Sequence, residues 1–584
     1  MDSTQLKTAN YRAVSKLFAI ILFLAAVYWP GIQHHWQIAH DPYFVPFDAS
    51  QYIPAFFKFD PSDPIPTTYI KEYFLNVICP PLYTWLTLFG IQWMDVRHFQ
   101  LVMMYVQYAV FIVVMGRLGW ILGGASLSFS VAAITITAWI FIGLGFIGGA
   151  PRMYAFPLIS LILYSLLQDR PILLALIIVL GALLYPVVAL IGGFCLACWL
   201  LLKPFSGNGL VSGWSFSRRL VTVGLAGVLA VSALLPMVLN AQSYGRRVVS
   251  TDTATYPEAG SDGNYRVYDQ LPYQLFGIEW TSYFLGPLYS HGDPIVPALN
   301  LHKKLDSTTL LMALAIAGLA ATAIMLAGLR VIVRSEQSGG ALRCLAFFPA
   351  CAVLHIFSWL AAPYLYIPTR YFMFSLPFLL TLVFPWSLQA LLKRTPLLQR
   401  SRKLGEFVFL GIIGAYLAAF GGRGNVDFSA SLVEQPARPL FDVVAALPKN
   451  AVIAGWPVGT LRKLEYVTRR NAFLTGDLHQ VLHLKFMQAM RVRMDAIFDA
   501  YFCTDTAPLY RLRDQFGVTH LIVEKRDFTD PKHPPEYFAP WRSRIGPRLA
   551  AIKGKEYLLN EALQKKAAIF NQNGFVLLDL AKLP

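Results

Sequence analysis

The stretch GGAPRMYAFPLISLILYSLL, residues 148 to 167, is almost wholly apolar and has a single charge, Arg152, near its start. It belongs to a series of apolar blocks, each roughly 17 to 30 residues long, which is the length that matches the hydrocarbon core of a bilayer. The chain has 584 residues, of which 56% are hydrophobic and only 14% charged. The sequence therefore predicts a polytopic α-helical membrane protein.

The net charge of +16 does not indicate a nucleic-acid partner. Much of the Lys and Arg lies in short loops beside apolar blocks, where positive charge orients a chain in the membrane. The first apolar block, residues 14 to 32, has no small-residue cleavage site and predicts a retained first span. Because Lys7, Arg12 and Lys16 precede it, we expect the N-terminus to be cytoplasmic.

The number of spans depends on whether residues 76 to 91, NVICPPLYTWLTLFGI, cross the membrane. If they do not, the later basic loops, including residues 393 to 403, fall on the cytoplasmic side; if they do, these loops fall outside. The positive-inside rule favours the first alternative and about eleven transmembrane helices. Within residues 171 to 202, Tyr185-Pro186 predicts a break between two short helices.

Two regions follow from this topology. We expect a transmembrane domain over residues 1 to 421, with outer loops at 33 to 97 and 239 to 306, and an extracytoplasmic α/β domain over 422 to 584. The second region alternates short apolar runs with amphipathic ones, as in a small α/β fold. Its predicted strands are residues 451 to 457, 519 to 524 and 574 to 580, and its predicted helices are 486 to 502 and 506 to 517, the latter ended by Gly517.

Arg152 and Arg370 lie at the outer ends of predicted spans, against the positive-inside trend. A charge at membrane depth is costly, so a partner or a ligand is expected for each. The alternative is that each side chain extends to the outer head groups. Tyr154 and Tyr371 follow closely and could support the same ligand, or could belong to the aromatic belt at the interface.

The first outer loop contains the candidate bases. Asp48 precedes the helix-like run SQYIPAFF and is the first choice, with a helix N-cap as its alternative. Asp41 is the second choice, with an Asp-Pro turn as its alternative. His40 could bind a metal beside Asp41 or be a polar loop residue, so Mg²⁺ or Mn²⁺ stays open. The prolines of DPSDP, residues 60 to 64, favour a turn.

These residue types suit chemistry on a lipid-linked phosphate at the outer membrane surface. Arginine binds phosphate through paired N–H donors, and a carboxylate can take a proton from an acceptor hydroxyl. No glycine loop typical of nucleotide binding is found, which suggests a donor that arrives through the membrane. Arg469 and Arg470 of the C-terminal region could reach this site from above, or could form a solvated surface pair.

The layout resembles the GT-C class of membrane glycosyltransferases: a first span, a long acidic outer loop, many further spans and a C-terminal soluble domain outside. Residues 455 to 477 and 513 to 525 resemble the opening and the helix-Gly-strand unit of that domain, and residues 148 to 167 a membrane segment of such proteins. The resemblance implies a polyprenyl-phosphate-linked sugar donor. The chain departs from the class because its first loop lacks an adjacent acidic pair.

The leading hypothesis is therefore an inverting sugar transfer from a polyprenyl phosphate to an extracytoplasmic acceptor, with Arg152 and Arg370 holding the phosphate and Asp48 or Asp41 as base. A non-catalytic subunit of a membrane complex, with membrane protein partners, is the alternative that the missing acidic pair favours. A lipid-linked substrate transporter is the third, although acidic residues are almost absent from the apolar blocks. The expected location is a bacterial inner membrane with the C-terminal domain in the periplasm.

Overall fold

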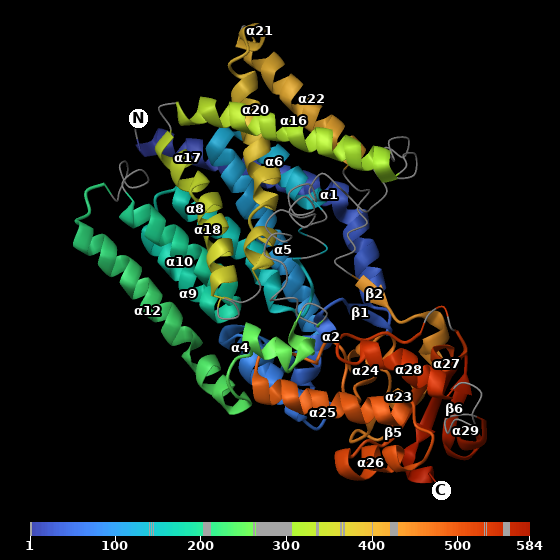
Figure 1. The fold of residues 1–584 in the computed structure, drawn as a ribbon. Helices are drawn as coiled ribbons and strands as arrows, with labels where there is room; N and C mark the ends of the chain where they lie inside the picture. Colours follow the sequence, from blue (N-terminus) through green and yellow to red (C-terminus); the bar gives the residue numbers. More distant parts are fainter. Residues whose placement is uncertain are drawn as a thin grey trace.

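The computed structural model describes residues 3 to 583 apart from 139–140, 142, 144, 203–211, 261–262, 264–306, 335–337, 362–364, 366–367, 400, 421–429, 531, 533 and 553–560. Elongated helices form one part of the molecule, and a mixed helix and strand region, residues 430 to 583, lies against one end of them (Figure 1). The N-terminus and the C-terminus lie at opposite ends. We call residues 430 to 583 the C-terminal region.

The helical part contains five helices long and apolar enough to cross a membrane, counted over the described residues. They fall in α1 (Ser3–Ala39), α5 (Val96–Gly123), α12 (Phe216–Ala241), α16 (Ser307–Val333) and the run of α17 (Ser338–Leu345) with α18 (Phe347–Leu360). Five shorter apolar stretches comprise α6 (Ala125–Thr137), η3 (Pro151–Tyr154) with α8 (Ala155–Leu167), α9 (Pro171–Leu184), α10 (Pro186–Leu201), and η9 (Leu379–Val383) with α20 (Phe384–Leu392). The chain thus has the helices of a membrane protein, whereas the number of crossings stays a prediction.

The break predicted at Tyr185-Pro186 is confirmed. Tyr185 has extended backbone angles (φ −157°, ψ 96°) between α9 and α10, because proline cannot continue the hydrogen bonding of the preceding helix. The two helices pack closely, and a β-carbon on Gly181 would lie 2.9 Å from the backbone nitrogen of Ala189. Glycine at this position therefore allows the close approach.

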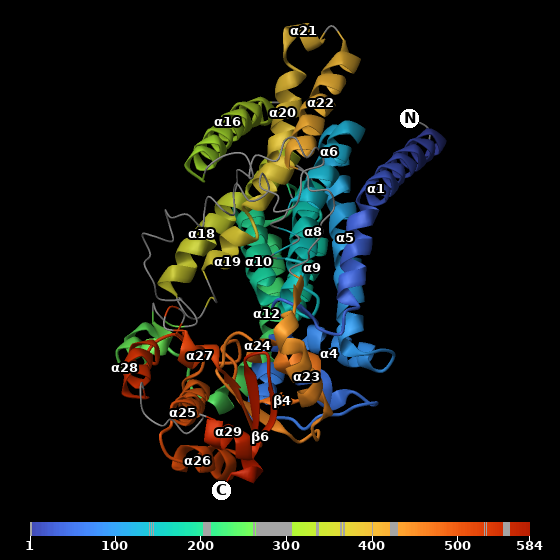
Figure 2. The same cartoon turned by 90° about the vertical axis from the view of Figure 1, so that its right-hand side faces the viewer.

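Residues 76 to 91 contain a π-helical turn and one short helix. A π-helical turn, η2 (Phe74–Ile78), precedes α4 (Pro81–Ile91), whose 11 residues reach about 16 Å, roughly half a bilayer core. Trp85 and Phe89, four residues apart, are both exposed, while Tyr83 on the opposite face is buried. α4 lies at the end of the bundle nearest the C-terminal region (Figure 2). This arrangement supports the non-crossing alternative.

The C-terminal region is built on a five-stranded sheet of order β4-β3-β5-β7-β6. The pairs β3–β4 and β3–β5 are parallel, and the pairs β5–β7 and β6–β7 are antiparallel. The strands are β3 (Val452–Ala454), β4 (Asn471–Ala472), β5 (His520–Glu524), β6 (Ala568–Gln572) and β7 (Phe575–Asp579), and the helices of eight or more residues are α23 (Arg438–Ala446), α24 (Leu461–Thr468), α25 (Leu484–Tyr501), α26 (Ala507–Phe516) and α28 (Arg542–Ile552).

The predicted strands and helices of this region are confirmed at β3, β5, β7, α25 and α26. Buried apolar runs such as His520–Glu524, in which all five residues are buried, become central strands. Gly517 ends α26 in the left-handed conformation (φ +67°), which a residue without a β-carbon adopts at little cost.

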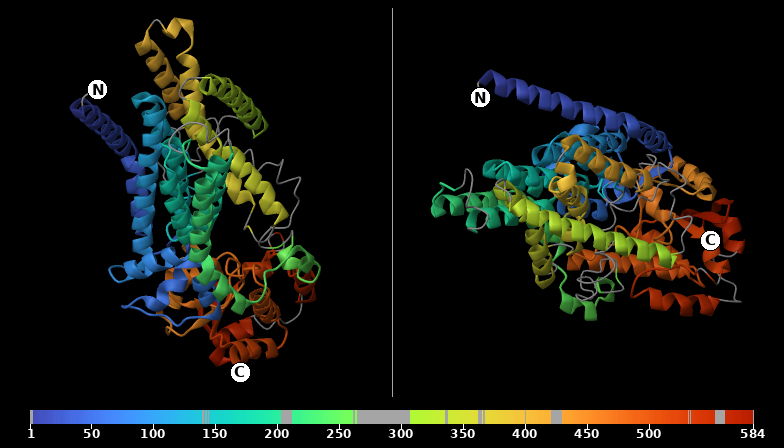
Figure 3. Two further views of the ribbon diagram at one scale, coloured as in Figure 1. Left: turned by 90° about the vertical axis from the view of Figure 1, so that its left-hand side faces the viewer. Right: turned by 90° about the horizontal axis from the view of Figure 1, so that it is seen from above.

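The segment predicted as the first outer loop, residues 33 to 97, is folded against the C-terminal region. Its strand β1 (Phe44–Pro46) pairs antiparallel with β2 (Ala430–Leu432), so segments almost 400 residues apart share one small sheet. α2 (Ala49–Tyr52), η1 (Ile53–Phe59) and α3 (Tyr69–Tyr73) follow. The ring of Tyr73 stacks on that of Phe486 with centroids 3.7 Å apart. Side views show this loop beside the C-terminal region, at the same end of the helical bundle (Figures 2 and 3).

Candidate functional site

Asp48 and Arg152, two residues proposed from the sequence, form an ion pair. Asp48 Oδ2 lies 2.7 Å from Arg152 Nη2, and the side chains are 17% and 11% exposed. Asp48 stands at the N-cap position of α2, but its side chain makes no capping hydrogen bond there. Its Oδ1 instead accepts a hydrogen bond from Gln51 Nε2 (3.3 Å). Its carboxylate is therefore directed to the arginine of the membrane segment.

Gly149, in the stretch 148 to 167, allows the first loop to approach closely enough for this contact. Gly149 has a φ of +98°, and a β-carbon there would lie 2.7 Å from Ile53 Cγ1 of the first outer loop. The hydroxyl of Tyr83 donates to the Gly149 carbonyl oxygen (2.6 Å). The turn before α8 thus packs directly on α2 and η1, and Arg152, three residues later, reaches Asp48.

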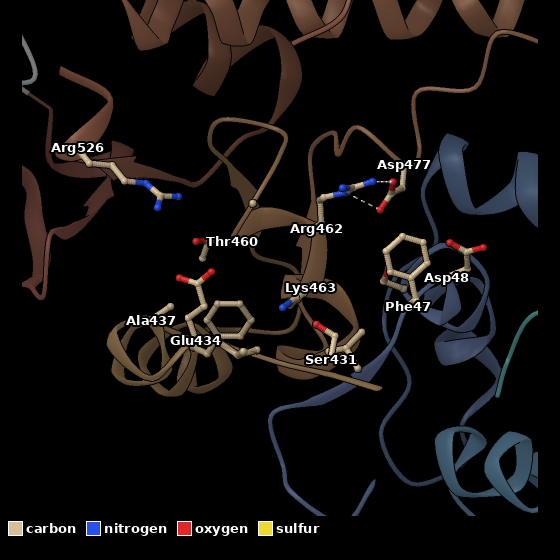
Figure 4. Close-up of a pocket in the computed structure, with 15 residues that line it drawn as sticks. Phe47, Asp48, Ser431, Glu434, Ala437, Thr460, Arg462, Lys463, Asp477 and Arg526 are labelled. Carbon is tan, nitrogen blue, oxygen red and sulfur yellow. Dashed lines mark hydrogen bonds and ion pairs between the residues drawn. The ribbon is translucent and has the colours of Figure 1, made fainter. Parts of the chain in front are cut away.

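Asp48 also lines a cavity of about 200 Å³ between the first outer loop and the C-terminal region, which we call the junction pocket (Figure 4). The loop contributes four residues, namely Val45, Phe47, Asp48 and Ser50. The C-terminal region contributes the others: Ser431, Val433, Glu434, Ala437, Phe441, Gly459, Thr460, Arg462, Lys463, Asp477 and Arg526. The pocket therefore exists only when the two parts of the chain are in contact.

Most charges of the junction pocket are compensated. Arg462 binds Asp477 through two nitrogens, with Nε 2.9 Å from Oδ2, and this hydrogen bonding raises the pKa of Arg462. Arg526 Nη2 lies 2.8 Å from a carboxylate oxygen of Glu524. Lys463 donates to the carbonyl oxygen of Leu432 (2.7 Å), and burial lowers the pKa of its ammonium group. These side chains offer both hydrogen-bond donors and acceptors to a ligand.

The other candidate base, Asp41, lies outside the junction pocket. Its Oδ1 accepts the backbone N–H of Tyr43 (2.8 Å), which is the turn chemistry expected as the alternative. Its Oδ2 lies 3.4 Å from Arg438 Nη2 of the C-terminal region. Asp41 thus helps to attach the loop to that region, and Asp48 is the only first-loop aspartate that lines the described pocket.

Arg469 joins the first loop to the C-terminal region, Arg470 binds within that region, and neither contacts the Asp48–Arg152 pair in the described part of the chain. Arg469, in the left-handed conformation (φ 53°), pairs with Asp60 at 2.7 Å, with Asp63 at 3.3 Å and with Asp95.

Arg470 donates to the carbonyl oxygens of Leu447 and Ala445, each at 2.7 Å. With Arg470 only 8% exposed and the Arg469 side chain 11%, the solvated surface pair considered above is wrong.

The structure places Arg370 apart from this pair. Its Nη1 lies 3.0 Å from Met373 Sδ, and no described contact joins it to Asp48 or Arg152. Tyr371 is fully buried and donates to the Leu365 carbonyl oxygen (2.7 Å). Tyr154 is also buried, at 3% exposure. A shared phosphate site for these residues stays a prediction.

His40 is exposed and lies beside aromatic neighbours. Its Nδ1 is 2.7 Å from the Trp36 carbonyl oxygen, and its ring lies 5.7 Å from that of His98. Within the described residues, no group of three or more His, Cys, Asp or Glu side chains has an arrangement that could hold a metal.

Sequence reasoning did not identify the pocket residues of the C-terminal region. Glu434, Thr460, Lys463 and Asp477 are scattered over more than 40 residues and have no recognisable motif. Gly459, in the left-handed conformation (φ +67°), precedes α24 and lines the same pocket. The likeness noted for residues 455 to 477 was the only signal that marked this segment.

No family model matches the chain, and no curated protein matches it. Several solved structures, however, are similar to the chain. The oligosaccharyltransferase of Archaeoglobus fulgidus in the apo form is 11% identical, with a TM-score of 0.48, over 88% of this chain and 70% of that one. ArnT from Cupriavidus metallidurans is similar in its apo state (12% identity, TM-score 0.43, 95% and 97% covered). Its form bound to undecaprenyl phosphate is 13% identical, with a TM-score of 0.42, over 96% of this chain and 98% of that one.

All three similarities have TM-scores below 0.5 and identities of 11 to 13%, so the resemblance to the GT-C class stays a prediction from the sequence.

Proposed function

We propose that the chain is an inverting membrane glycosyltransferase that moves a sugar from a polyprenyl phosphate to an extracytoplasmic acceptor, with Asp48 as the base. The observation that supports this most directly is the position of Asp48. It lines the junction pocket and contacts Arg152, which is at the start of a membrane helix. One carboxylate thus faces both a pocket for an acceptor and a cation for a phosphate.

The proposed reaction follows from these two neighbours. The acceptor hydroxyl gives its proton to the Asp48 carboxylate while its oxygen attacks the anomeric carbon of the donor. The bond from that carbon to the phosphate oxygen breaks, and its electron pair leaves with the phosphate. Arg152 stabilises the charge that develops on the phosphate. Attack from the side opposite the leaving group inverts the anomeric configuration.

In the free protein Arg152 is held by Asp48, so the donor phosphate must compete with this carboxylate. Arg152 Nε is buried without a hydrogen-bond partner among the described residues, which leaves the guanidinium with unused donor capacity. Arg370, Tyr154 and Tyr371 stay candidates for further donor contacts. No metal is required in this scheme, and Mg²⁺ or Mn²⁺ stays open.

The proposed orientation places the junction pocket outside the cytoplasm. The N-terminus and α21 (Pro396–Gln399), which lies within the basic stretch 393 to 403, are at the end of the molecule far from the C-terminal region (Figures 1 and 2). Basic segments stay preferentially in the cytoplasm. We propose a transmembrane domain over residues 1 to 421 and a periplasmic domain over 422 to 584, in a bacterial inner membrane.

A second candidate function is a non-catalytic subunit of a membrane complex. The ion pairs of the first outer loop favour it, because Asp41, Asp48, Asp60 and Asp63 all have basic partners. A loop whose aspartates serve only to attach the C-terminal region would have this pattern.

The test compares Asp48→Asn with Asp41→Asn, a matched change in the same loop outside the junction pocket. Purified variants in nanodiscs are given radiolabelled undecaprenyl-phosphate hexoses, with solubilised native membranes as the source of acceptor. Loss of the base is expected to slow transfer by about 10²- to 10⁴-fold, whereas Asp41→Asn transfers at nearly the normal rate.

Equal rates in the two variants would refute Asp48 as the base. If the folded wild-type protein transfers no label and instead co-purifies with a defined membrane partner, the subunit function holds. Arg152→Gln adds an independent measurement, since it is expected to weaken binding of undecaprenyl phosphate itself.

A further inference from the structure

The charge balance of the junction pocket indicates the kind of molecule that fills it. Three acidic side chains and three basic ones line the pocket: Asp48, Glu434 and Asp477, and Arg462, Lys463 and Arg526. Such a lining neither attracts nor repels a charged ligand as a whole. A neutral ligand is therefore favoured over an anion or a cation.

Two of these groups keep hydrogen-bonding capacity for a ligand. Asp48, Asp477 and the two arginines are engaged in ion pairs, but neither Glu434 nor Lys463 has an ion-pair partner among the residues that the structure describes. Lys463 uses one of its three N–H groups on a backbone oxygen. A carboxylate and an ammonium group in one pocket suit hydroxyl groups, each of which both donates and accepts.

An aromatic ring completes the lining. Phe47 is 59% exposed although it lies beside Asp48, and Figure 4 shows its ring next to Asp48 on the side of the pocket where Arg462 and Asp477 also lie. An exposed ring in a polar pocket provides a flat apolar surface that costs solvation energy until a ligand covers it. The hydroxyls of Ser431 and Thr460 lie in the same lining.

The size of the junction pocket limits the ligand further. Its volume of about 200 Å³ is below the roughly 300–1,000 Å³ of pockets that enclose drug-sized ligands. One small ring fits such a space better than an extended peptide.

We propose that the junction pocket is the acceptor subsite and that it holds a neutral sugar ring. The apolar face of the ring packs on Phe47, its hydroxyls bond Glu434 and Lys463, and one hydroxyl is directed to Asp48. This inference rests on the proposed function and adds the acceptor's chemical class, a glycan rather than a peptide or a free anion.

The experiment uses the full chain in nanodiscs and methyl hexosides as probes, observed by saturation-transfer NMR. Ring protons of the hexoside are expected to receive saturation from the protein. Phe47→Ala removes the apolar surface and should weaken binding by about tenfold. Phe59→Ala is the matched control, because Phe59 is an exposed aromatic residue of the same loop (43%) that does not line the pocket. It should bind as the wild type does.

Glu434→Gln tests the polar side of the pocket and should also weaken hexoside binding. The proposal is overturned if Phe47→Ala and Phe59→Ala bind hexosides equally, or if a Gly-Ser-Thr peptide or inorganic phosphate saturates the pocket in place of the hexoside. Circular dichroism and a normal elution volume establish that each variant is folded.

Failure of this inference can be distinguished from failure of the proposed function. A protein that transfers label from undecaprenyl-phosphate hexose but binds no hexoside at Phe47 retains the transferase function and loses the acceptor assignment. If the wild type binds hexosides at Phe47 but Asp48→Asn transfers label as fast as the wild type does, the sugar site is retained and Asp48 is not the base.

Discussion

The buried ion pair between Lys71 and Glu465 should control the contact between the first outer loop and the C-terminal region. Lys71 Nζ lies 3.7 Å from Glu465 Oε1, and each side chain is only 5% exposed. Lys71 also donates to Asn471 Oδ1 of β4, and Glu465 accepts the backbone N–H of Ala472 (2.8 Å). Glu465 is on α24, the helix that also bears Arg462 and Lys463.

The expected cost follows from burial. Removal from water lowers the pKa of Lys71 and raises that of Glu465, and the opposite charge of each partner offsets this effect. In Lys71→Met the Glu465 carboxylate stays buried without its cation, which costs about 3–5 kcal/mol. The double change Lys71→Met with Glu465→Gln leaves no buried charge and should recover most of that loss.

The assay is hydrogen exchange with mass spectrometry in nanodiscs, because it reports local opening of the junction. A cost of that size should speed exchange of the β4 and α24 amides by roughly 10²- to 10⁴-fold in Lys71→Met. Lys449→Met is the control, since its pair with Asp63 is exposed, with side chains 50% and 31% accessible. Loss of that pair should cost less than about 1 kcal/mol.

Two results would refute this reasoning. Exchange in Lys71→Met that is no faster than in Lys449→Met would show that the buried pair does not hold the junction. A double variant as labile as Lys71→Met alone would show that the cost arises from lost packing and not from an uncompensated charge.

Two further predictions concern other parts of the molecule. Burial raises the pKa of Asp527 from 3.8 to about 6, so the native state binds more protons than the unfolded state between these values. Stability of the C-terminal region should therefore fall by roughly 2 kcal/mol as the pH rises from 4 to 7. In Asp527→Asn, hydrogen exchange in β5 should no longer show this loss of stability with rising pH. The same pH profile in the variant and the wild type would contradict the prediction. Gly149→Ala forces a β-carbon towards Ile53 at a φ of +98°, and should loosen the first outer loop at a cost of about 1–3 kcal/mol. Faster exchange in α2 would show this, whereas Gly193→Ala, with open space around the β-carbon position, serves as the control.

Local patterns in the sequence were sufficient for much of the secondary structure. The helix break at Tyr185 depends on the proline that follows it, and the end of α26 depends on Gly517. The central strand His520–Glu524 has an apolar core, Leu521 to Val523, and all five of its residues are buried. Each of these features is decided by residues within a few positions, so a single sequence contains the information.

The candidate site was predictable only in part. Asp48 and Arg152 were each selected from topology and residue type, but their ion pair joins positions more than 100 residues apart. Arg469 illustrates the limit, since a basic residue on the C-terminal region was equally consistent with a phosphate contact. Only the folded chain shows that Asp60, Asp63 and Asp95 converge on it.

By itself, the sequence determined that this protein is a chain of apolar helices followed by an α/β region, because hydropathy and periodicity act over short distances. Tertiary structure alone decided that β1 pairs with β2 and that Asp48 faces both Arg152 and the junction pocket. The physical reason is that pairing between distant segments depends on which surfaces meet when the whole chain packs. Charge and shape complementarity of those surfaces has no local signature.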